Sequence, residues 1–187
     1  MTWEGLNPPY RTIVADPPWR YRQKFADPGS MWTKRRSAGK GAAAAYTCMT
    51  QADLLAMPVS QLADDACHMY LWVTNQFMVD GHALMAAWGF EVKTILTWVK
   101  DGLRMGFYYR NNTEHILFGA KGGLKTLRRD CPTAFVAHAP RNHSQKPAAF
   151  YDMVESMSPG PYLELFARQP RLGWDHWGKG YELGRAA

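Results

Sequence analysis

Short apolar runs alternate with helical segments along almost the whole chain, and this alternation restricts the possible folds more than any other feature. We expect strands at residues 11–15, 67–74, 90–100, 113–121 and 162–167, and helices at residues 50–57, 75–88 and 144–157. Such a pattern places helices on both faces of a mainly parallel sheet. The sequence therefore predicts an α/β fold, and a length of 187 residues suits a single catalytic domain, residues 1–187.

The ends of these elements carry further signals. Thr50 and Asn75 precede two of the expected helices and are predicted to cap them, and Pro147 falls in the first turn of the third. Three segments that follow strands fit neither pattern: residues 21–45, 101–112 and 122–142. Ligands of doubly wound folds bind beyond the carboxyl ends of the strands, so we expect these segments to surround one site.

Composition excludes several classes of protein. Hydrophobic residues make up 47% of the chain and charged residues 20%, and no apolar run is long enough to cross a bilayer. The first ten residues lack the basic flank and apolar stretch of a secretion signal. Cys48, Cys67 and Cys131 have no metal-ligand spacing and suit a reducing compartment. We therefore expect a cytoplasmic protein without a metal site.

The net charge of +6 is concentrated in two regions. Residues 20–41 contain seven basic side chains against Asp27 alone, and residues 100–129 contain seven more, interleaved with Phe107, Tyr108 and Tyr109. Basic groups bind phosphates and aromatic faces stack on bases, so together they indicate a nucleic-acid partner. A solvated charged face is the alternative for each run taken alone.

The sequence Ala-Asp-Pro-Pro-Trp at residues 15–19 follows the first expected strand directly. Each proline restricts the residue before it to extended conformations, so the chain is stiff at this corner. We expect the Asp16 carboxylate and the Pro17 carbonyl to point outward as two acceptors for the amine of an adenine, with Trp19 stacked on the purine. Such hydrogen bonds stabilise the positive charge that develops when the amine attacks an electrophile. A second motif of this kind, Asn7 to Tyr10, follows a polar start and is interpreted as a surface turn.

Several motifs then occur in a characteristic order: ADPPW, LWVTN, WVK, RNNTEHILFGAKG, HSQKP, ELFAR and GWDHWG. In this order they resemble the MT-A/METTL family of S-adenosylmethionine-dependent adenine-N6 methyltransferases, from about residue 10 to residue 178. The resemblance implies a Rossmann-like class I methyltransferase fold with permuted motif order, the catalytic motif first and the cofactor motif last. It also implies S-adenosylmethionine as the cofactor and no metal.

The resemblance assigns roles to individual residues. Asp16, Pro17, Pro18 and Trp19 hold the target adenine, and Asp16 also lies beside the methyl donor. The other residues implied to bind the cofactor are Lys121, His143, Ser144, Lys146, Glu164, Phe166 and Arg168. Those expected to contact the substrate are Trp19, Arg20, Tyr21, Lys34, Arg35, Arg36, Tyr46, Asn75, Tyr109, Arg110 and Asn111. The sequence departs from the family pattern at WGKGYE, where Lys179 cannot accept a hydrogen bond from a ribose and Glu182 is the possible substitute.

The function favoured by these observations is methylation of adenine N6 in DNA, with the base flipped out of a duplex or taken from a single strand. RNA is the second candidate substrate. Two alternatives belong to other classes: a non-catalytic nucleic-acid-binding subunit, and an enzyme that methylates a glutamine amide of a protein. The intact Asp16 argues against the first and the two basic regions argue against the second. A homodimer or a partner subunit is compatible with each.

Overall fold

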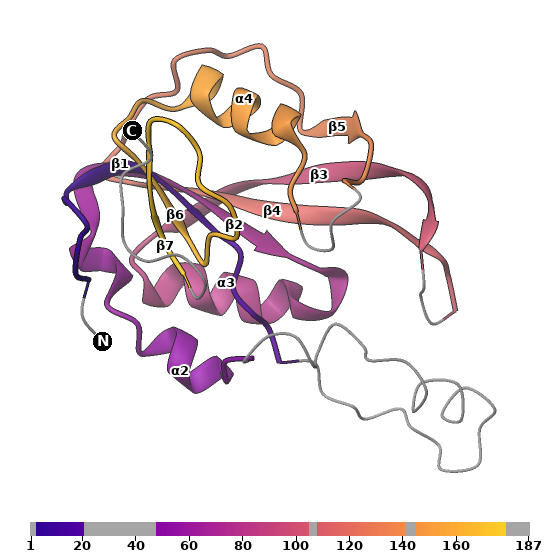
Figure 1. Ribbon diagram of the computed structural model, residues 1–187, viewed down its shortest axis with the longest axis horizontal. Coiled ribbons are helices and arrows are strands. Elements are labelled where there is room, and N and C mark those ends of the chain that lie inside the picture. Colours follow the sequence, from indigo (N-terminus) through magenta and orange to yellow (C-terminus); the bar gives the residue numbers. More distant parts are fainter. Residues whose placement is uncertain (1–2, 21–47, 105–107, 141–144, 179–187) are drawn as a thin grey trace.

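The central feature of the fold is a seven-stranded sheet. The structure is a computed structural model that describes residues 3–20, 48–104, 108–140 and 145–178. Within these residues the strand order is β5-β3-β4-β2-β1-β6-β7 (Figure 1). The strands are β1 (Tyr10–Ala15), β2 (Ala63–Val73), β3 (Glu91–Arg104), β4 (Asn111–Lys121), β5 (Ala134–Ala137), β6 (Tyr162–Leu165) and β7 (Trp174–Trp177). Four of the six neighbouring pairs are parallel and β4 runs against the other described strands, which confirms a mainly parallel sheet.

Helices cover both faces of the sheet, as the sequence predicts. α2 (Gln51–Leu55) and α3 (Met78–Ala87) lie on one face, and α4 (Ala148–Met157) lies on the other (Figure 1). Two 3-10 helices, η2 (Val59–Gln61) and η3 (Asn75–Phe77), precede β2 and α3. In the described part of the chain, no helix has both the length and the apolar character that a membrane span requires.

Each face of the sheet has its own apolar core, and β1 contributes to both. Ile13 lies in the core that contains Leu84 of α3, whereas Val14 lies in the core that contains Phe150 of α4. All four side chains are at most 1% exposed. Burying a side chain of this size stabilises the fold by about 1.5–3 kcal/mol, so β1 is fixed from both sides. The residues that follow it therefore begin from a rigid support.

Of the two predicted helix caps, Thr50 and Asn75, the structure confirms only the first. Thr50 caps α2 as predicted: its hydroxyl accepts from the Asp53 backbone at 3.2 Å, and the Asp53 carboxylate accepts from the Thr50 backbone at 3.1 Å. The prediction that Asn75 caps the next helix is wrong, because Asn75 lies inside η3 and α3 begins at Met78. The 3-10 turn carries Phe77 into the core, where it stacks on Trp19.

β3 and β4 form one long antiparallel hairpin. The sequence predicts a loop at residues 101–112, but β3 continues to Arg104 and β4 begins at Asn111, where these two residues pair. The polar composition of residues 101–104 hides their strand conformation from a hydrophobic pattern. Figure 1 shows the hairpin extending beyond the end of α3. Tyr108 and Tyr109 lie between the two strands and are exposed.

The segment after β4 starts at the end of the strands opposite the carboxyl end of β1. Because β4 is antiparallel to β2, its last residue, Lys121, pairs with Cys67 near the beginning of β2. The chain then passes over the α4 face, where the Leu127 backbone donates to the Met157 carbonyl at 2.8 Å, and reaches β5 (Figure 1). The expectation that all of residues 122–142 surround one site is therefore wrong. Strands β5 and β7 were not predicted: β5 lies inside a segment that fitted no pattern, and β7 follows the last expected strand.

A buried polar chain ties this segment to the sheet and to α4. His68 Nε2 lies 2.9 Å from the Leu124 carbonyl, and His68 Nδ1 lies 2.7 Å from the Ser158 hydroxyl. The Tyr70 hydroxyl lies 2.7 Å from the same Ser158 oxygen. Burial lowers the pKa of His68, so the imidazole is neutral and Nε2 carries the proton that the carbonyl accepts. One serine hydroxyl therefore satisfies two buried partners.

Replacing Ser158 with alanine is expected to lower the free energy of unfolding by about 1–3 kcal/mol, because two buried polar groups lose their partner. Urea unfolding followed by circular dichroism measures this loss. Tyr70→Phe is the matched control: it removes one hydroxyl but leaves the bond between Ser158 and His68, so its cost is expected to be smaller. Equal unfolding midpoints for the unchanged protein and the Ser158→Ala variant would contradict the role given to this chain.

Candidate functional site

The Asp-Pro-Pro corner lies at the carboxyl end of β1, between the ends of β2 and β6. The Asp16 backbone donates to the Leu165 carbonyl of β6 at 3.4 Å. The Pro17 carbonyl accepts from the Trp19 backbone at 2.8 Å, and the Pro18 carbonyl accepts from the Met49 backbone at 3.0 Å. The Pro17 carbonyl, expected to accept from a ligand, therefore already accepts one hydrogen bond within the chain. A carbonyl oxygen has two lone pairs, so one acceptor position on Pro17 remains.

Trp19 belongs to the core. Its residue is 8% exposed, its ring stacks on Phe77 with centroids 5.1 Å apart, and its indole nitrogen donates to the Trp72 carbonyl at 3.2 Å. A base stacks on an open face of an indole, but Phe77 covers one face of this ring and the residue as a whole is almost completely buried. The expectation that Trp19 stacks on a base is not met in this structure. Its contacts instead hold the corner against η3 and β2.

Two cations approach the Asp16 carboxylate. Lys146 Nζ lies 3.1 Å from Asp16 Oδ2, and Arg168 lies 3.8 Å from the same oxygen. The Lys146 side chain is only 8% exposed, and its ammonium group also lies 4.1 Å from the centre of the Trp72 ring. Charges that are partly withdrawn from water need opposite partners, and here the two cations supply them for the half-buried Asp16 carboxylate.

The alternation of charges continues along the same edge of the sheet. Lys146 also lies 3.5 Å from Glu114 of β4, and Glu114 forms a second, short ion pair with Lys100 of β3. Burial raises the pKa of Glu114, but Lys146 and Lys100 outweigh burial and hold the pKa below its ordinary value. An ion-pair network therefore begins at Arg168 and runs through Asp16, Lys146 and Glu114. It ends at Lys100, which lies near the turn of the hairpin.

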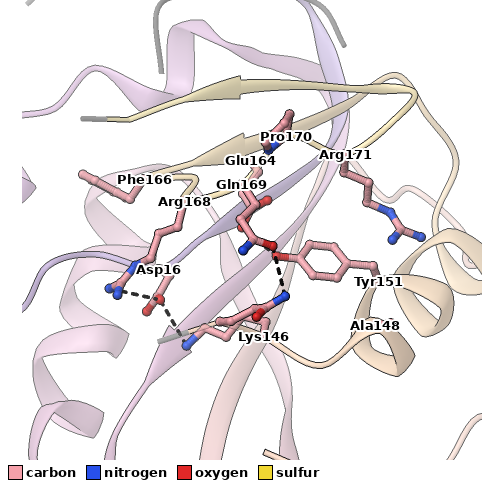
Figure 2. A pocket seen from close by; sticks show the side chains of 11 residues that line it. Asp16, Lys146, Ala148, Tyr151, Glu164, Phe166, Arg168, Gln169, Pro170 and Arg171 are labelled. Atoms are coloured by element: carbon pink, nitrogen blue, oxygen red, sulfur yellow. Dashed lines mark hydrogen bonds and ion pairs between the residues drawn. The ribbon is translucent and has the colours of Figure 1, made fainter. Parts of the chain in front are cut away.

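Asp16 and Lys146 line a pocket at the carboxyl ends of β1 and β6 and the start of α4 (Figure 2). The pocket is also lined by Gln145, Tyr151, Glu164, Phe166, Arg168, Gln169 and Arg171. The chain leaves β1 toward β2 on one side, and β6 lies on the other side, so the pocket sits where the order of the strands reverses. Open α/β sheets bind ligands at this switch point.

Glu164 is the buried carboxylate of the pocket. It is 7% exposed, and the Tyr151 hydroxyl donates to its Oε1 atom at 2.8 Å. The pKa of Glu164 is raised to about 7: burial is the main cause and the nearby Asp16 charge adds to it, whereas the hydrogen bond from Tyr151 acts in the opposite direction. Glu164 therefore changes charge near neutral pH. The hydrogen bond between its Oε1 atom and the Tyr151 hydroxyl already links it to α4.

The bend after β6 shapes the wall of the pocket. Phe166 has a φ of 64°, which is rare for a side-chain-bearing residue and marks a constrained turn. Gly178, at the end of β7, packs on this turn: a Cβ atom there would lie 2.7 Å from the Ala167 carbonyl oxygen. The glycine of the WGKG motif is thus required by close backbone packing beside the pocket, whereas Lys179 and Glu182 lie outside the described residues.

The structure brings together five of the residues expected to bind the cofactor: Asp16, Lys146, Glu164, Phe166 and Arg168. It does not bring Lys121 to them. Lys121 is the last residue of the antiparallel strand β4, so it lies at the opposite end of the strands from Asp16. His143 and Ser144 lie outside the described residues, as do Tyr21, Lys34, Arg35, Arg36 and Tyr46. Arg20 and Asn75 are exposed at the edge that carries Asp16. Tyr109, Arg110 and Asn111 lie at the end of the hairpin, away from the pocket.

Four charged or polar residues of this edge were missed by sequence reasoning: Glu114, Lys100, Tyr151 and Arg171. Glu114 is part of the quoted block RNNTEHILFGAKG, and recognising that β4 is antiparallel would have selected it in place of Lys121. Tyr151 lies near the start of α4, and no spacing in the sequence connects it with Glu164. Within the described ranges, no three His, Cys, Asp or Glu side chains gather to hold a metal ion.

This sheet order, with a charged pocket at the switch point beside the first strand, defines a Rossmann-like α/β protein of the methyltransferase type. The model of the MT-A70 family matches residues 10–180, and the chain belongs to this family. The matched range includes Asp16, Lys146, Glu164 and Arg168, which are the pocket residues assigned from the sequence.

Relatives differ in how much of their length this chain spans. The chain is 32% identical over 179 residues to the Type II methyltransferase M.MunI from a Mycoplasma species, covering 90% of this chain and 76% of that protein. It is 29% identical over 168 residues to an N(6)-adenosine-methyltransferase MT-A70-like protein of Drosophila melanogaster, covering 85% of this chain and 24% of the relative. It is 26% identical over 168 residues to the human N(6)-adenosine-methyltransferase catalytic subunit METTL3, covering 85% of this chain and 26% of METTL3.

Replacing Trp19 with alanine tests whether this residue supports the core. Loss of its stacking on Phe77 and of its indole hydrogen bond is expected to lower the free energy of unfolding by about 3–5 kcal/mol. A residue that served only to stack on a base would cost little stability when removed. Chemical denaturation measures the difference.

Tyr109→Ala is the matched control for this experiment. Tyr109 is also an aromatic residue, but it is 87% exposed, so its removal is expected to change stability by no more than about 0.5 kcal/mol. A Trp19→Ala variant as stable as the Tyr109→Ala variant would show that Trp19 is not a core residue.

Proposed function

We propose that this protein transfers a methyl group from S-adenosylmethionine to the 6-amino group of adenine in DNA. The observation that carries the proposal is the common pocket of Asp16, Lys146, Arg168 and Glu164 at the end of β1 and β6, in a chain of the MT-A70 family. In this pocket the acidic corner, which we propose binds the amine, lies next to groups that suit an amino-acid nucleoside. The roles below follow from the chemistry of these side chains.

The pocket residues fit such a cofactor in charge and in position. Lys146 and Arg168 offer cations to a carboxylate, and the pocket reaches Ala148 at the amino terminus of α4, which also attracts anions. Glu164 offers an acceptor to ribose hydroxyl groups, and Phe166 offers an apolar surface to the adenine ring. When bound, S-adenosylmethionine supplies an electrophilic methyl group on a sulfonium centre. His143 and Ser144 remain proposed contacts outside the described residues.

Asp16 is the proposed catalytic residue. Its carboxylate accepts a hydrogen bond from the target amine, and the free lone pair of the Pro17 carbonyl accepts a second. These bonds favour the pyramidal, positively charged nitrogen of the transition state over the planar amine of the free base. Pro17 and Pro18 fix the direction of both acceptors, and Trp19 anchors the corner through Phe77.

Nucleic-acid binding is proposed for the basic and aromatic residues around this edge. Arg20 and Asn75 are exposed next to the corner, and Tyr109, Arg110 and Asn111 lie on the exposed hairpin. Cations neutralise backbone phosphates, and exposed aromatic rings stack on unpaired bases. We include Tyr21, Lys34, Arg35, Arg36 and Tyr46 from the segment outside the described residues, because this segment carries much of the basic charge.

DNA is preferred to RNA as the substrate. The chain is 32% identical to the Type II methyltransferase M.MunI over 76% of that protein, whereas its 26–29% identity to the N(6)-adenosine-methyltransferases extends over about a quarter of each. RNA remains the second candidate, because the latter relatives carry adenosine in their names. We extend the proposal to a cytoplasmic enzyme, with free thiols at Cys48, Cys67 and Cys131, that works as a homodimer or with a partner subunit.

The proposal is tested by incubating the purified protein with S-adenosylmethionine labelled in the methyl group and with single-stranded DNA, double-stranded DNA or RNA. Digestion to nucleosides then identifies the product. We expect N6-methyldeoxyadenosine from at least one DNA substrate. Preferential labelling of RNA would replace DNA in the proposal, and binding of nucleic acid without any label would favour a non-catalytic subunit.

Replacing Asp16 with asparagine is expected to lower turnover by about 100- to 1,000-fold, because the charged acceptor of the amine is lost. Binding of nucleic acid is expected to change little, since it depends on basic residues elsewhere. Single-turnover methylation and gel-shift titration measure the two effects separately.

Glu91→Gln is the control for this variant, because Glu91 is a surface carboxylate whose side chain is 76% exposed. It is expected to leave turnover unchanged. If the Asp16→Asn variant methylates as fast as the Glu91→Gln variant, Asp16 is not the catalytic acceptor.

Replacing Lys146 with glutamine is expected to weaken binding of S-adenosylmethionine by about 10- to 100-fold, because the carboxylate loses a charged donor. Titration calorimetry measures this affinity directly. Lys93→Gln is the control, since Lys93 forms an exposed ion pair with Glu91 on the surface. Equal affinities in the two variants would remove Lys146 from the proposed cofactor site.

A further inference from the structure

Tyr151 links α4 to the buried carboxylate of Glu164 on β6. Its hydroxyl donates to Glu164 Oε1 at 2.8 Å, and both residues line the same pocket as Asp16 and Lys146 (Figure 2). Among the described residues, no hydrogen bond is made to the second oxygen of Glu164, Oε2. One oxygen of this carboxylate is therefore held by the protein, and the other remains for a ligand.

The ring of Tyr151 is held on several sides. The Arg171 guanidinium lies 5.0 Å from the centre of the ring, and the Trp174 ring meets it edge-on at 5.7 Å. Arg171 is itself fixed by Glu155 at 2.8 Å and by Asp152 at 3.1 Å. The hydroxyl of Tyr151 consequently has little freedom to turn away from Glu164.

Tyr151 acts only as a donor in this pair. Burial and the neighbouring Glu164 raise the pKa of Tyr151, so the hydroxyl keeps its proton throughout the neutral range. A tyrosine that keeps its proton donates continuously to one oxygen of the carboxylate. The direction of this hydrogen bond is thus fixed by the chemistry of the pocket.

Several charged groups face Glu164 from the surrounding elements. Asp16 follows β1 and raises the pKa of Glu164, whereas Lys146 before α4 and Arg171 after β6 lower it. His176 of β7 pairs with Glu164 in register. The net pKa is about 7; burial is the largest influence and raises it, and the hydrogen bond from Tyr151 is the next largest and lowers it. Tyr151 is therefore the principal group that favours the carboxylate form.

We propose that Tyr151 is a positioning residue for the methyl donor: it orients the Glu164 carboxylate so that Oε2 accepts from the hydroxyl groups of the nucleoside. This role rests on the proposed function, because it requires that a ribose occupy the pocket. Tyr151 acts through Glu164 and needs no contact of its own with the ligand. It stabilises the acceptor in the charge state and the orientation that hydroxyl donors require.

The experiment is a calorimetric titration with S-adenosylmethionine between about pH 6 and about pH 9, because ligand affinity follows the charge of Glu164. Glu164 is charged above its pKa, so the affinity of the unchanged protein is expected to fall as the pH drops below about 7. Tyr151→Phe keeps the ring but removes the donor, which moves the fall in affinity upward by about 0.5–1 pH unit. The variant is then weaker near pH 7 by about three- to tenfold and approaches the unchanged protein at high pH.

Tyr162→Phe is the matched control. Tyr162 also packs on Trp174, but its hydroxyl donates to the Ser158 carbonyl at 2.9 Å instead of to Glu164. This variant loses an equivalent hydroxyl and is expected to keep the pH dependence of the unchanged protein. Glu164→Gln, which has no titrating group at this position, is expected to bind weakly and without this pH dependence.

The outcomes separate this inference from the function on which it rests. Parallel curves for Tyr151→Phe and the unchanged protein, offset equally at every pH, would assign Tyr151 a merely structural role and overturn the inference alone. No binding by the unchanged protein at any pH would overturn the proposed cofactor and the inference with it. An upward shift in Tyr151→Phe that is absent from Tyr162→Phe supports the role.

Discussion

Parallel pairing of β1 with both β2 and β6 determines where the groups of the site lie. β1 is buried on both faces and hydrogen-bonded to a strand on each side, so its position is fixed. Asp16 follows directly at its carboxyl end and is held in place with it. The same pairing places Glu164, which is opposite Val14, just behind that end. The proposed catalytic corner and the proposed cofactor residues thus meet without any long loop between them.

Charge compensation is the second organising principle of this edge. Asp16 and Glu114 alternate with Arg168, Lys146 and Lys100, so each buried ion has at least one opposite neighbour. A buried charge without a partner would cost several kcal/mol, which explains why Lys146 is shared between two carboxylates. The network also joins the pocket to Lys100, near the turn of the β3–β4 hairpin, and so connects the two regions proposed for cofactor and substrate.

Much of the fold and part of the site follow from the sequence. The parallel strands β1, β2 and β6 are short apolar runs between helical segments, and the motifs on them lead to Asp16 and Glu164. The error at Lys121 arose because an apolar run does not reveal its direction: in the antiparallel β4 the first residues, with Glu114, reach the site and the last do not. Trp19 was misjudged for a related reason, since a tryptophan suited to stacking on a base is equally suited to a core. Tyr151 and Arg171 depend on contacts between α4 and the turn after β6, which no local pattern encodes.

The ion pairs of Asp16 have a thermodynamic implication for the order of events in the pocket. Lys146 and Arg168 form ion pairs with this aspartate, and the same two cations are the ones we propose to bind the carboxylate of the cofactor. A ligand that recruits either of them weakens the hold on Asp16 and leaves its oxygens freer for an amine donor. Linkage is reciprocal, so an amine bound to Asp16 would in turn leave the cations freer to bind the carboxylate. The proposed cofactor and the proposed adenine would then strengthen each other's binding through shared counter-ions, without a change in the fold.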